Sequence, residues 1–180
     1  MSSTGTEKVN ATDRIIKAVT SLVGQIQKSP AKANTQFKAN ARLDEGVLAR
    51  ISIRDFELVS DEPAILGGTN HGPNPVELVL GALAACQEIV LSAYAAVLGI
   101  KIEGIDVDVK GDLDLRGFLN MADVRPGYNG VEFTTTIRTA ENDRAKLQQL
   151  IHFAEKRCPV YDILTNPVTV SGKFKFETVN

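Results

Sequence analysis

Apolar residues recur along the chain with two different periods, and each period predicts a type of element. Near the N-terminus they return every three or four residues, which predicts an amphipathic helix that is N-capped at or near Thr12 and ended by Ser29-Pro30. The apolar face of this helix comprises Ile15, Ile16, Val19, Leu22, Val23 and Ile26. We therefore divide the chain into a tail with an amphipathic helix, residues 1–30, and a single globular domain, residues 31–180.

Beyond residue 30 the period changes to two, which is typical of strands with one buried face. A turn is expected at Asp44-Glu45-Gly46, and loops rich in proline, glycine and asparagine are expected at 61–75 and 116–130. The strands predicted in this way cover residues 37–43, 47–53, 56–58, 102–115, 131–139 and 168–176.

Three further helices are predicted in the second half of the chain. The first is mostly apolar, begins at Pro75 and ends before Gly99. The second is capped by Asn142 or Asp143, and the third is a short helix over 159–164. Runs of strands and helices in this order predict an α+β fold with largely antiparallel sheet.

The apolar helix that begins at Pro75 influences the expected assembly. Its length would span a bilayer, but Gln87 and Glu88 lie near its middle, and no basic residues closely precede it. It is therefore expected inside a protein and not in a membrane. Because a chain of this size gives limited cover to a helix that is apolar on nearly every side, we expect a homodimer.

Composition excludes other classes of partner. The chain is 43% hydrophobic and 23% charged, as soluble globular proteins are, and its net charge is −2. Lysine and arginine are scattered, which argues against nucleic acid. The N-terminus lacks an apolar run after a basic start, so we expect no secretory signal and a cytoplasmic, reducing location.

Two cysteines carry the candidate chemistry. Cys86 lies inside the apolar segment VELVLGALAACQEIVL, and Cys158 opens the segment RCPVYDIL. Pro159 is favoured at the first position of a helix, so Cys158 is expected at the N-cap, where free N–H groups favour a thiolate. In a reducing compartment a cysteine pair more often indicates redox or metal chemistry than a structural disulfide.

The sequence gives little support to a metal site or a bound cofactor. Together with the cysteines, His71 and His152 lack the close spacing of a structural zinc site, so no metal is expected. The glycine-rich loop at 67–72 lacks the ending of a phosphate-binding loop, so no bound cofactor is expected. The alternative for Cys86 is an inert apolar residue in a core helix.

The segments GTNHGPNPVELVLGALAAC and RCPVYDIL resemble the OsmC/Ohr family of thiol-dependent hydroperoxide reductases. The resemblance extends over about residues 33–178. Its specific parts are the pair Asn74-Pro75, the sequence Ala84-Ala85-Cys86 and the pair Cys158-Pro159.

The resemblance implies an OsmC-like fold, in which two intertwined subunits wrap their sheets around long central helices. It implies a reductase of organic hydroperoxides or hydrogen peroxide with Cys86 as nucleophile and Cys158 as resolving thiol. A disulfide between them would be reduced by an external dithiol of the lipoyl type. It also implies an arginine from the N-terminal strands, for which Arg42, Arg50 and Arg54 are candidates and Arg42 or Arg54 is favoured.

One position departs from the family pattern. Peroxidase members carry a glutamate directly after the Asn-Pro pair to hold the arginine, whereas Val76 stands here. Glu77 follows, but on a helix it lies about 180° from Cys86 at about 100° per residue. Val76 therefore favours an alternative function, a non-catalytic protein that binds a small hydrophobic ligand in the cleft between subunits, while the two cysteines favour the peroxidase.

Overall fold

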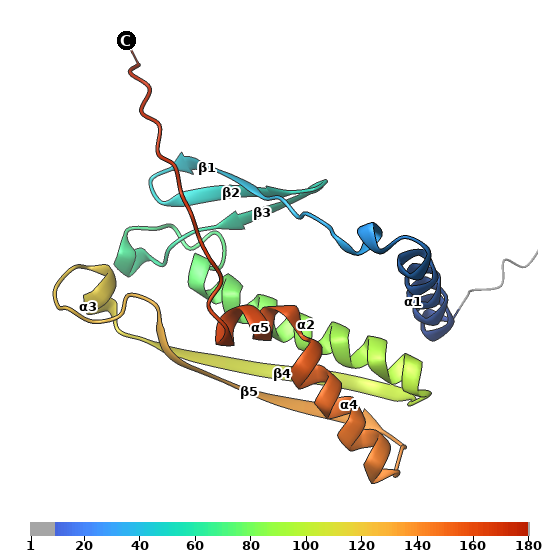
Figure 1. Ribbon diagram of the computed structural model, residues 1–180. Coiled ribbons are helices and arrows are strands. Elements are labelled where there is room, and N and C mark those ends of the chain that lie inside the picture. The colour runs from blue at the N-terminus through green and yellow to red at the C-terminus, as the bar shows by residue number, and fades with distance from the viewer. Residues whose placement is uncertain (1–9, 180) are drawn as a thin grey trace, which may run out of the picture.

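The computed structural model of the chain describes residues 10–179 as an α+β fold with two antiparallel sheets (Figure 1). Short 3₁₀ turns at Pro30–Ala33 and Ala64–Leu66 join the main elements. In chain order these are α1 (Ala11–Lys28), β1 (Asn40–Glu45), β2 (Leu48–Ile53), β3 (Phe56–Ser60), α2 (Pro75–Leu98), β4 (Ile102–Leu113), α3 (Leu115–Phe118), β5 (Tyr128–Thr139), α4 (Arg144–Arg157) and α5 (Pro159–Thr165).

A long hairpin of β4 and β5 supports the helices that carry the cysteines. The two strands pair in register from Ile105↔Ile137 to Gly111↔Val131, and their side chains alternate between half-buried and exposed, as the period of two predicts. Helix α2 packs on β4 and on α4. The core between these three elements contains Leu91, Ala95, Ile100, Leu150 and Ala154.

Helix α2 has the boundaries that the sequence predicts, because both of its ends are capped. The Asn74 side chain accepts a hydrogen bond from the Glu77 N–H at 2.9 Å, and the Glu77 carboxylate accepts one from the Asn74 N–H at 2.8 Å. Pro75 fills the first helical position. At the other end Gly99 adopts a left-handed conformation with φ of 67°, which a side chain would oppose.

One chain covers only one side of α2. Leu83, Leu91 and Ala95 are buried, whereas Val79 and Ile89 are exposed. By length and composition α2 is the one helix among residues 10–179 that could span a bilayer. Within the chain it packs on β4 and α4, so its exposed apolar side is a surface that a second chain could cover.

The structure differs from the sequence prediction at the C-terminus. Residues 167–179 run in extended conformation with no strand assigned, and Phe174 and Phe176 are 91% and 97% exposed. The alternating pattern identifies a chain that could form a strand, but a strand requires a hydrogen-bonding partner, and the described chain provides none here.

Smaller differences concern the ends of elements. The turn between β1 and β2 falls at Gly46 and Val47, with φ of 56° at Gly46, so Asp44 and Glu45 belong to β1. The predicted loop at 116–130 contains most of α3, and β5 begins at Tyr128. These shifts arise because backbone pairing and turn geometry, which the apolar pattern does not encode, fix the boundaries.

The loop before α2 is organised around a buried carboxylate. Asp61, 1% exposed, accepts hydrogen bonds from the N–H groups of Glu62 at 2.8 Å, Thr69 at 2.9 Å and His71 at 3.1 Å. The Thr69 hydroxyl donates a fourth at 2.7 Å. These hydrogen bonds stabilise the charged carboxylate and lower the pKa of Asp61 to about 2. The Thr69 hydroxyl makes the largest contribution to this shift, and the backbone N–H groups add to it. The loop thereby holds the start of α2.

We predict that Asp61→Asn lowers the thermal midpoint of the protein by several degrees at neutral pH, because the donors lose a charged acceptor. The folded pKa of about 2 lies below the ordinary 3.8, so the carboxylate's contribution is complete above about pH 4 and is lost as the pH falls towards 2. Thermal unfolding between pH 2 and 7 measures both effects. The exposed Asp55→Asn is the matched control, and equal midpoints for the two variants would contradict the prediction.

Candidate active site

The two cysteines, 72 residues apart in the sequence, lie side by side in the structure. Cys86 is on α2 and Cys158 is at the junction of α4 and α5, and their Sγ atoms are 3.0 Å apart. Both are free thiols. A disulfide has an S–S length of about 2.05 Å, so a small movement would bring the sulfur atoms to bonding distance.

The pair lies in an apolar cluster between α2, the β4–β5 hairpin and α5. Cys158 is 1% exposed, whereas Cys86 is half-buried, so an incoming reagent meets Cys86 first. The other members of the cluster are Leu83, Tyr94, Val90, Val109, Val131, Phe133, Val160 and Tyr161.

The helix that follows Cys158 begins as the sequence predicts, but its electrostatic effect is outweighed. Cys158 is the N-cap of α5, and its Sγ accepts a hydrogen bond from the Tyr161 N–H at 3.5 Å. Burial nevertheless raises the pKa of the Cys158 thiol, and the contact with Cys86 raises it further. The expectation of an activated thiolate at this N-cap therefore does not hold for the reduced, buried thiol.

None of the three candidate arginines forms a hydrogen bond with either sulfur. Arg42 lies opposite Arg50 across β1 and β2, and Arg50 Nε contacts Asp44 Oδ2 at 2.8 Å. Arg54 lies in the β2–β3 turn with its guanidinium 5.0 Å from the centre of the Phe56 ring. Figure 1 shows the sheet of β1 to β3 standing apart from α2, so the chain by itself does not bring these arginines to Cys86.

The start of α2 shows what replaces the family glutamate. Val76 is half-buried, and its carbonyl accepts a hydrogen bond from the Tyr128 hydroxyl at 2.9 Å. Glu77 is used in the capping box with Asn74.

A carboxylate that the sequence analysis missed lies beside this position. Glu62 and Val76 line the same pocket of about 190 Å³, and Glu62 Oε2 accepts a hydrogen bond from Asn74 Nδ2 at 3.4 Å. Glu62 is distant from the motif in sequence, so spacing could not reveal it. Asn74 offered one signal, because its side-chain oxygen caps α2 and leaves the amide N–H groups to find another partner.

Among residues 10–179 no three side chains of His, Cys, Asp or Glu come together as a group that could hold a metal ion. His71 contacts the Thr69 hydroxyl and lies near Asp61, so it belongs to the loop before α2. His152 lies on the exposed side of α4 beside Phe153.

Comparison with known proteins agrees with this arrangement. Residues 68–173 match the family of OsmC-like proteins, and this segment holds both cysteines. The chain is also 31% identical, over 132 residues, to the organic hydroperoxide resistance protein OhrB of Bacillus subtilis, covering 73% of this chain and 85% of that protein. The protein therefore belongs to the OsmC/Ohr family.

Solved structures show the same fold. An OsmC-like protein from Mycoplasma pneumoniae superposes with a TM-score of 0.63 at 22% identity, over 74% of this chain and 90% of that one. An organic hydroperoxide resistance protein OsmC from Legionella pneumophila superposes with a TM-score of 0.55 at 22% identity, over 73% and 90%. These structures confirm the expected OsmC-like fold of the single chain, and the intertwined homodimer stays a prediction.

We predict that oxidation by a hydroperoxide converts the pair into a Cys86–Cys158 disulfide whose rate of formation still rises above pH 9. Only a thiolate attacks an oxidised sulfur, and the pKa of Cys158 is raised above its ordinary value near 9, so a higher pH is needed to form its thiolate. Rapid-quench labelling with mass spectrometry measures the rate. Oxidised protein that keeps two free thiols would contradict the pairing, and a rate that levels off below pH 8 would contradict the raised pKa.

Proposed function

We propose that the protein is a thiol-dependent reductase of organic hydroperoxides, with Cys86 as nucleophile and Cys158 as resolving thiol. The observation that carries the proposal is the 3.0 Å approach of a half-buried and a fully buried thiol in an apolar cluster. Membership in the OsmC/Ohr family and the name of the Bacillus subtilis relative support a peroxide-related role.

The proposed reduction of a hydroperoxide has three steps. The Cys86 thiolate attacks one peroxide oxygen, the O–O bond breaks, and the other oxygen leaves as an alcohol after taking a proton, so that Cys86 becomes a sulfenic acid. The Cys158 thiolate then attacks Cys86 Sγ, the S–S bond forms, the S–O bond breaks, and the hydroxide leaves as water after taking a proton. An external dithiol, which we propose is of the lipoyl type and acts in the cytoplasm, returns two electrons and restores both thiols.

A cavity next to the cysteine cluster, lined by both apolar and polar side chains, favours organic substrates over hydrogen peroxide. It has a volume of about 290 Å³ and shares the walls formed by Leu83, Phe133 and Tyr161 with the cysteine cluster. Arg125 and Tyr128 also line it. A cavity of this size, close to the lower limit of about 300 Å³ for ligand pockets, suits the hydrocarbon part of a small hydroperoxide.

A cation near Cys86 is needed, because apolar surroundings favour the neutral thiol. We propose that it comes from Arg42 or Arg54 of a second copy, in an intertwined homodimer that covers the exposed side of α2. We further propose that Glu62 acts as a positioning residue for this guanidinium, in place of the glutamate that Val76 replaces. The pocket that Glu62 shares with Val76 supports this assignment.

A second candidate function is the binding of a hydrophobic ligand without turnover. Val76 favours it, because a valine cannot orient a guanidinium. The cavity next to the cysteine cluster would then be the ligand site. Consumption of hydroperoxide in the presence of a lipoyl-type dithiol separates the two candidates, since a binding protein would consume none.

The first test of the mechanism replaces each cysteine by serine. We expect Cys86→Ser to abolish hydroperoxide consumption, because the attacking sulfur is lost. We expect Cys158→Ser to allow one stoichiometric oxidation, which leaves a sulfenic acid on Cys86 that a dimedone-type probe traps. The two variants are each other's controls, and unchanged turnover in Cys86→Ser would remove Cys86 from the mechanism.

The second test concerns the orienting carboxylate. If Glu62 holds the guanidinium, Glu62→Gln should slow the oxidation of Cys86 by about tenfold or more, as expected when a charge-assisted hydrogen bond of at least about 1.4 kcal/mol is lost. Val76→Glu should raise the rate above that of the wild type, and in the Glu62→Gln background it should restore the lost rate. Stopped-flow oxidation of Cys86 measures all three. Unchanged rates at every pH would show that neither position limits the chemistry.

A further inference from the structure

Two buried polar side chains lack a hydrogen-bond partner within the described chain. One is Gln87, whose amide nitrogen Nε2 is unpaired, and the other is Thr135, whose hydroxyl oxygen Oγ1 is unpaired. Gln87 is only 2% exposed. A buried polar group without a partner costs free energy, so the great majority of such groups in folded proteins are paired. An unpaired amide on a helix of the core therefore calls for an explanation.

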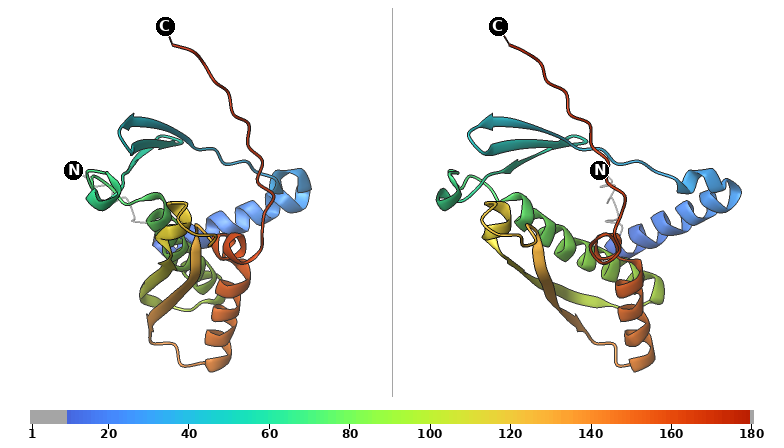
Figure 2. Two further views of the ribbon diagram at one scale, coloured as in Figure 1. Left: turned by 90° about the vertical axis from the view of Figure 1, so that its left-hand side faces the viewer. Right: turned by 60° about the vertical axis from the view of Figure 1, so that its left-hand side comes forward.

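Both residues line one cavity of about 200 Å³ between α2, β5 and α4. Gln87 reaches the cavity from α2, and Thr135 reaches it from β5. Figure 2 shows α4 beside the β4–β5 hairpin, and α4 also contacts α2. Most of the remaining lining is apolar and includes Leu91, Phe133, Ile137 and Ile151.

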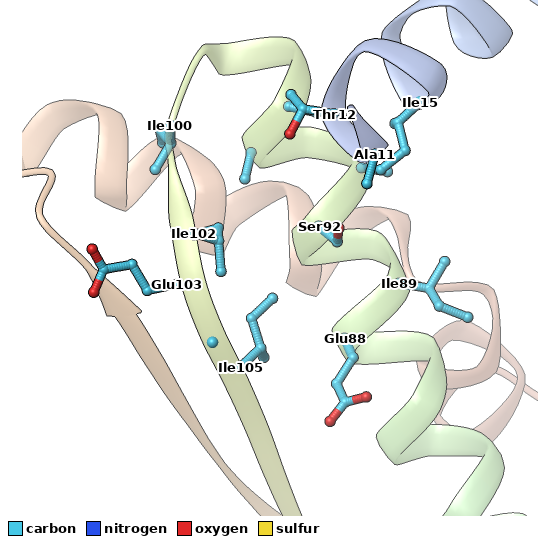
Figure 3. Close-up of a pocket in the computed structure, with 14 residues that line it drawn as sticks. Ala11, Thr12, Ile15, Glu88, Ile89, Ser92, Ile100, Ile102, Glu103 and Ile105 are labelled. Carbon is cyan, nitrogen blue, oxygen red and sulfur yellow. The ribbon is translucent and has the colours of Figure 1, made fainter. Parts of the chain in front are cut away.

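A larger groove on a different side of α2 has another chemistry. Its volume is about 570 Å³, and it lies between α1, α2 and β4 (Figure 3). Figure 3 shows Glu88 and Ser92 on the side of α2 that belongs to this groove. No buried side-chain nitrogen or oxygen of its lining lacks a partner within residues 10–179. Gln87 and Thr135 line neither this groove nor the cavity next to the cysteine cluster, so their unpaired atoms belong to the smaller cavity.

The size and the walls of the smaller cavity favour an organic molecule over water. A water molecule takes up about 30 Å³ in the liquid and needs two to four polar partners inside a protein. A cavity of about 200 Å³ would hold several waters, but its buried wall offers them only Gln87 and Thr135. An organic molecule with one oxygen atom would instead cover the apolar walls and pair with both polar groups.

A third polar residue of the lining decides the charge of this molecule. Glu155 is exposed on α4, and it forms no ion pair within the part of the chain that the structure describes. Its carboxylate would repel an anion in the cavity. The amide of Gln87 and the hydroxyl of Thr135 can both donate a hydrogen bond to an oxygen. The lining therefore fits a neutral molecule with a carbonyl or hydroxyl oxygen.

We propose that the cavity between α2, β5 and α4 binds a small, neutral, largely apolar molecule that carries one carbonyl or hydroxyl oxygen. This oxygen accepts hydrogen bonds from Gln87 Nε2 and Thr135 Oγ1, and the apolar part packs on the aliphatic and aromatic walls. The site is distinct from the cavity next to the cysteine cluster, although Phe133 lines both. It depends neither on a homodimer nor on the peroxidase chemistry.

Four probes of similar shape test the recognition of a neutral oxygen: acetophenone, 1-phenylethanol, ethylbenzene and benzoate. NMR titration of the reduced protein, with labelled glutamine amides and isoleucine methyl groups, locates each probe and gives its dissociation constant. We expect acetophenone and 1-phenylethanol to shift the signals of the Gln87 amide and of the Ile137 and Ile151 methyl groups. Ethylbenzene should bind at least about fivefold more weakly than acetophenone, because it forgoes two neutral hydrogen bonds. Benzoate should also bind more weakly, because its charge would be dehydrated near Glu155.

Three substitutions with little change in volume test the assigned residues. Gln87→Met and Thr135→Val should each reduce the preference for acetophenone over ethylbenzene at least about twofold, and together they should abolish it. Thr134→Val, on the exposed face of β5, is the matched control and should change nothing. Because Gln87→Met and Thr135→Val remove unpaired buried groups, neither should lower the thermal midpoint, so a lost preference cannot come from unfolding. Glu155→Gln should reduce the difference in affinity between benzoate and acetophenone.

Several results would overturn the proposal. They are equal affinities for acetophenone and ethylbenzene, a preference that survives both donor substitutions, or binding by none of the four probes. Shifts confined to the backbone amides of Asn129 and Thr165 would place the molecule in the cavity next to the cysteine cluster and would equally reject the site. A nuclear Overhauser effect from the Gln87 amide to long-lived water that persists at saturating acetophenone would assign the cavity to water. Probe binding as expected, in a protein that consumes no hydroperoxide, would reject only the proposed function.

Discussion

The packing of α2 against the β4–β5 hairpin is the constraint on which the rest of the structure depends. The capping box of Asn74 and Glu77 fixes where α2 begins, and Gly99 fixes where it ends and where the chain turns into β4. With both ends set, the rotation of α2 about its axis decides which residues face the core. That rotation directs Leu83 and Leu91 inward and leaves Cys86 at the border between the core and the exposed side, against the start of α5.

The cysteine pair shows how two local effects compete. An N-cap position favours a thiolate, but its influence is modest and falls off within the first turn, whereas removal from water opposes the charged form directly. Cys158 experiences both, and burial prevails, so its pKa rises. Cys86, half-buried and within 3.0 Å, is the more accessible sulfur. The environment thus makes Cys86 the accessible thiol and Cys158 the buried one.

Several surfaces of the described chain remain uncovered. Exposed apolar side chains lie on one side of α2, on the sheet of β1 to β3 that stands apart from it, and along residues 167–179. Residues 167–179 also have no strand partner within the described chain. The apolar side of α1 adds a fourth such surface. Among residues 10–179 no arginine forms a hydrogen bond with either sulfur, and Arg125 lines the cavity that shares Leu83, Phe133 and Tyr161 with the cysteine cluster.

The sequence by itself determined the α+β class, the limits of α2, the cap at Cys158 and the two cysteines as the candidate chemistry, because periodicity, caps and proline act over a few residues. Helix geometry also predicts that Glu77 lies about 180° from Cys86 around α2. Only the tertiary structure decided the 3.0 Å approach of the sulfurs, the raised pKa of Cys158, the place of Glu62 beside Val76, and the absence of pairing for the predicted strand at 168–176. These depend on burial and on partners far away in sequence, which no local pattern encodes.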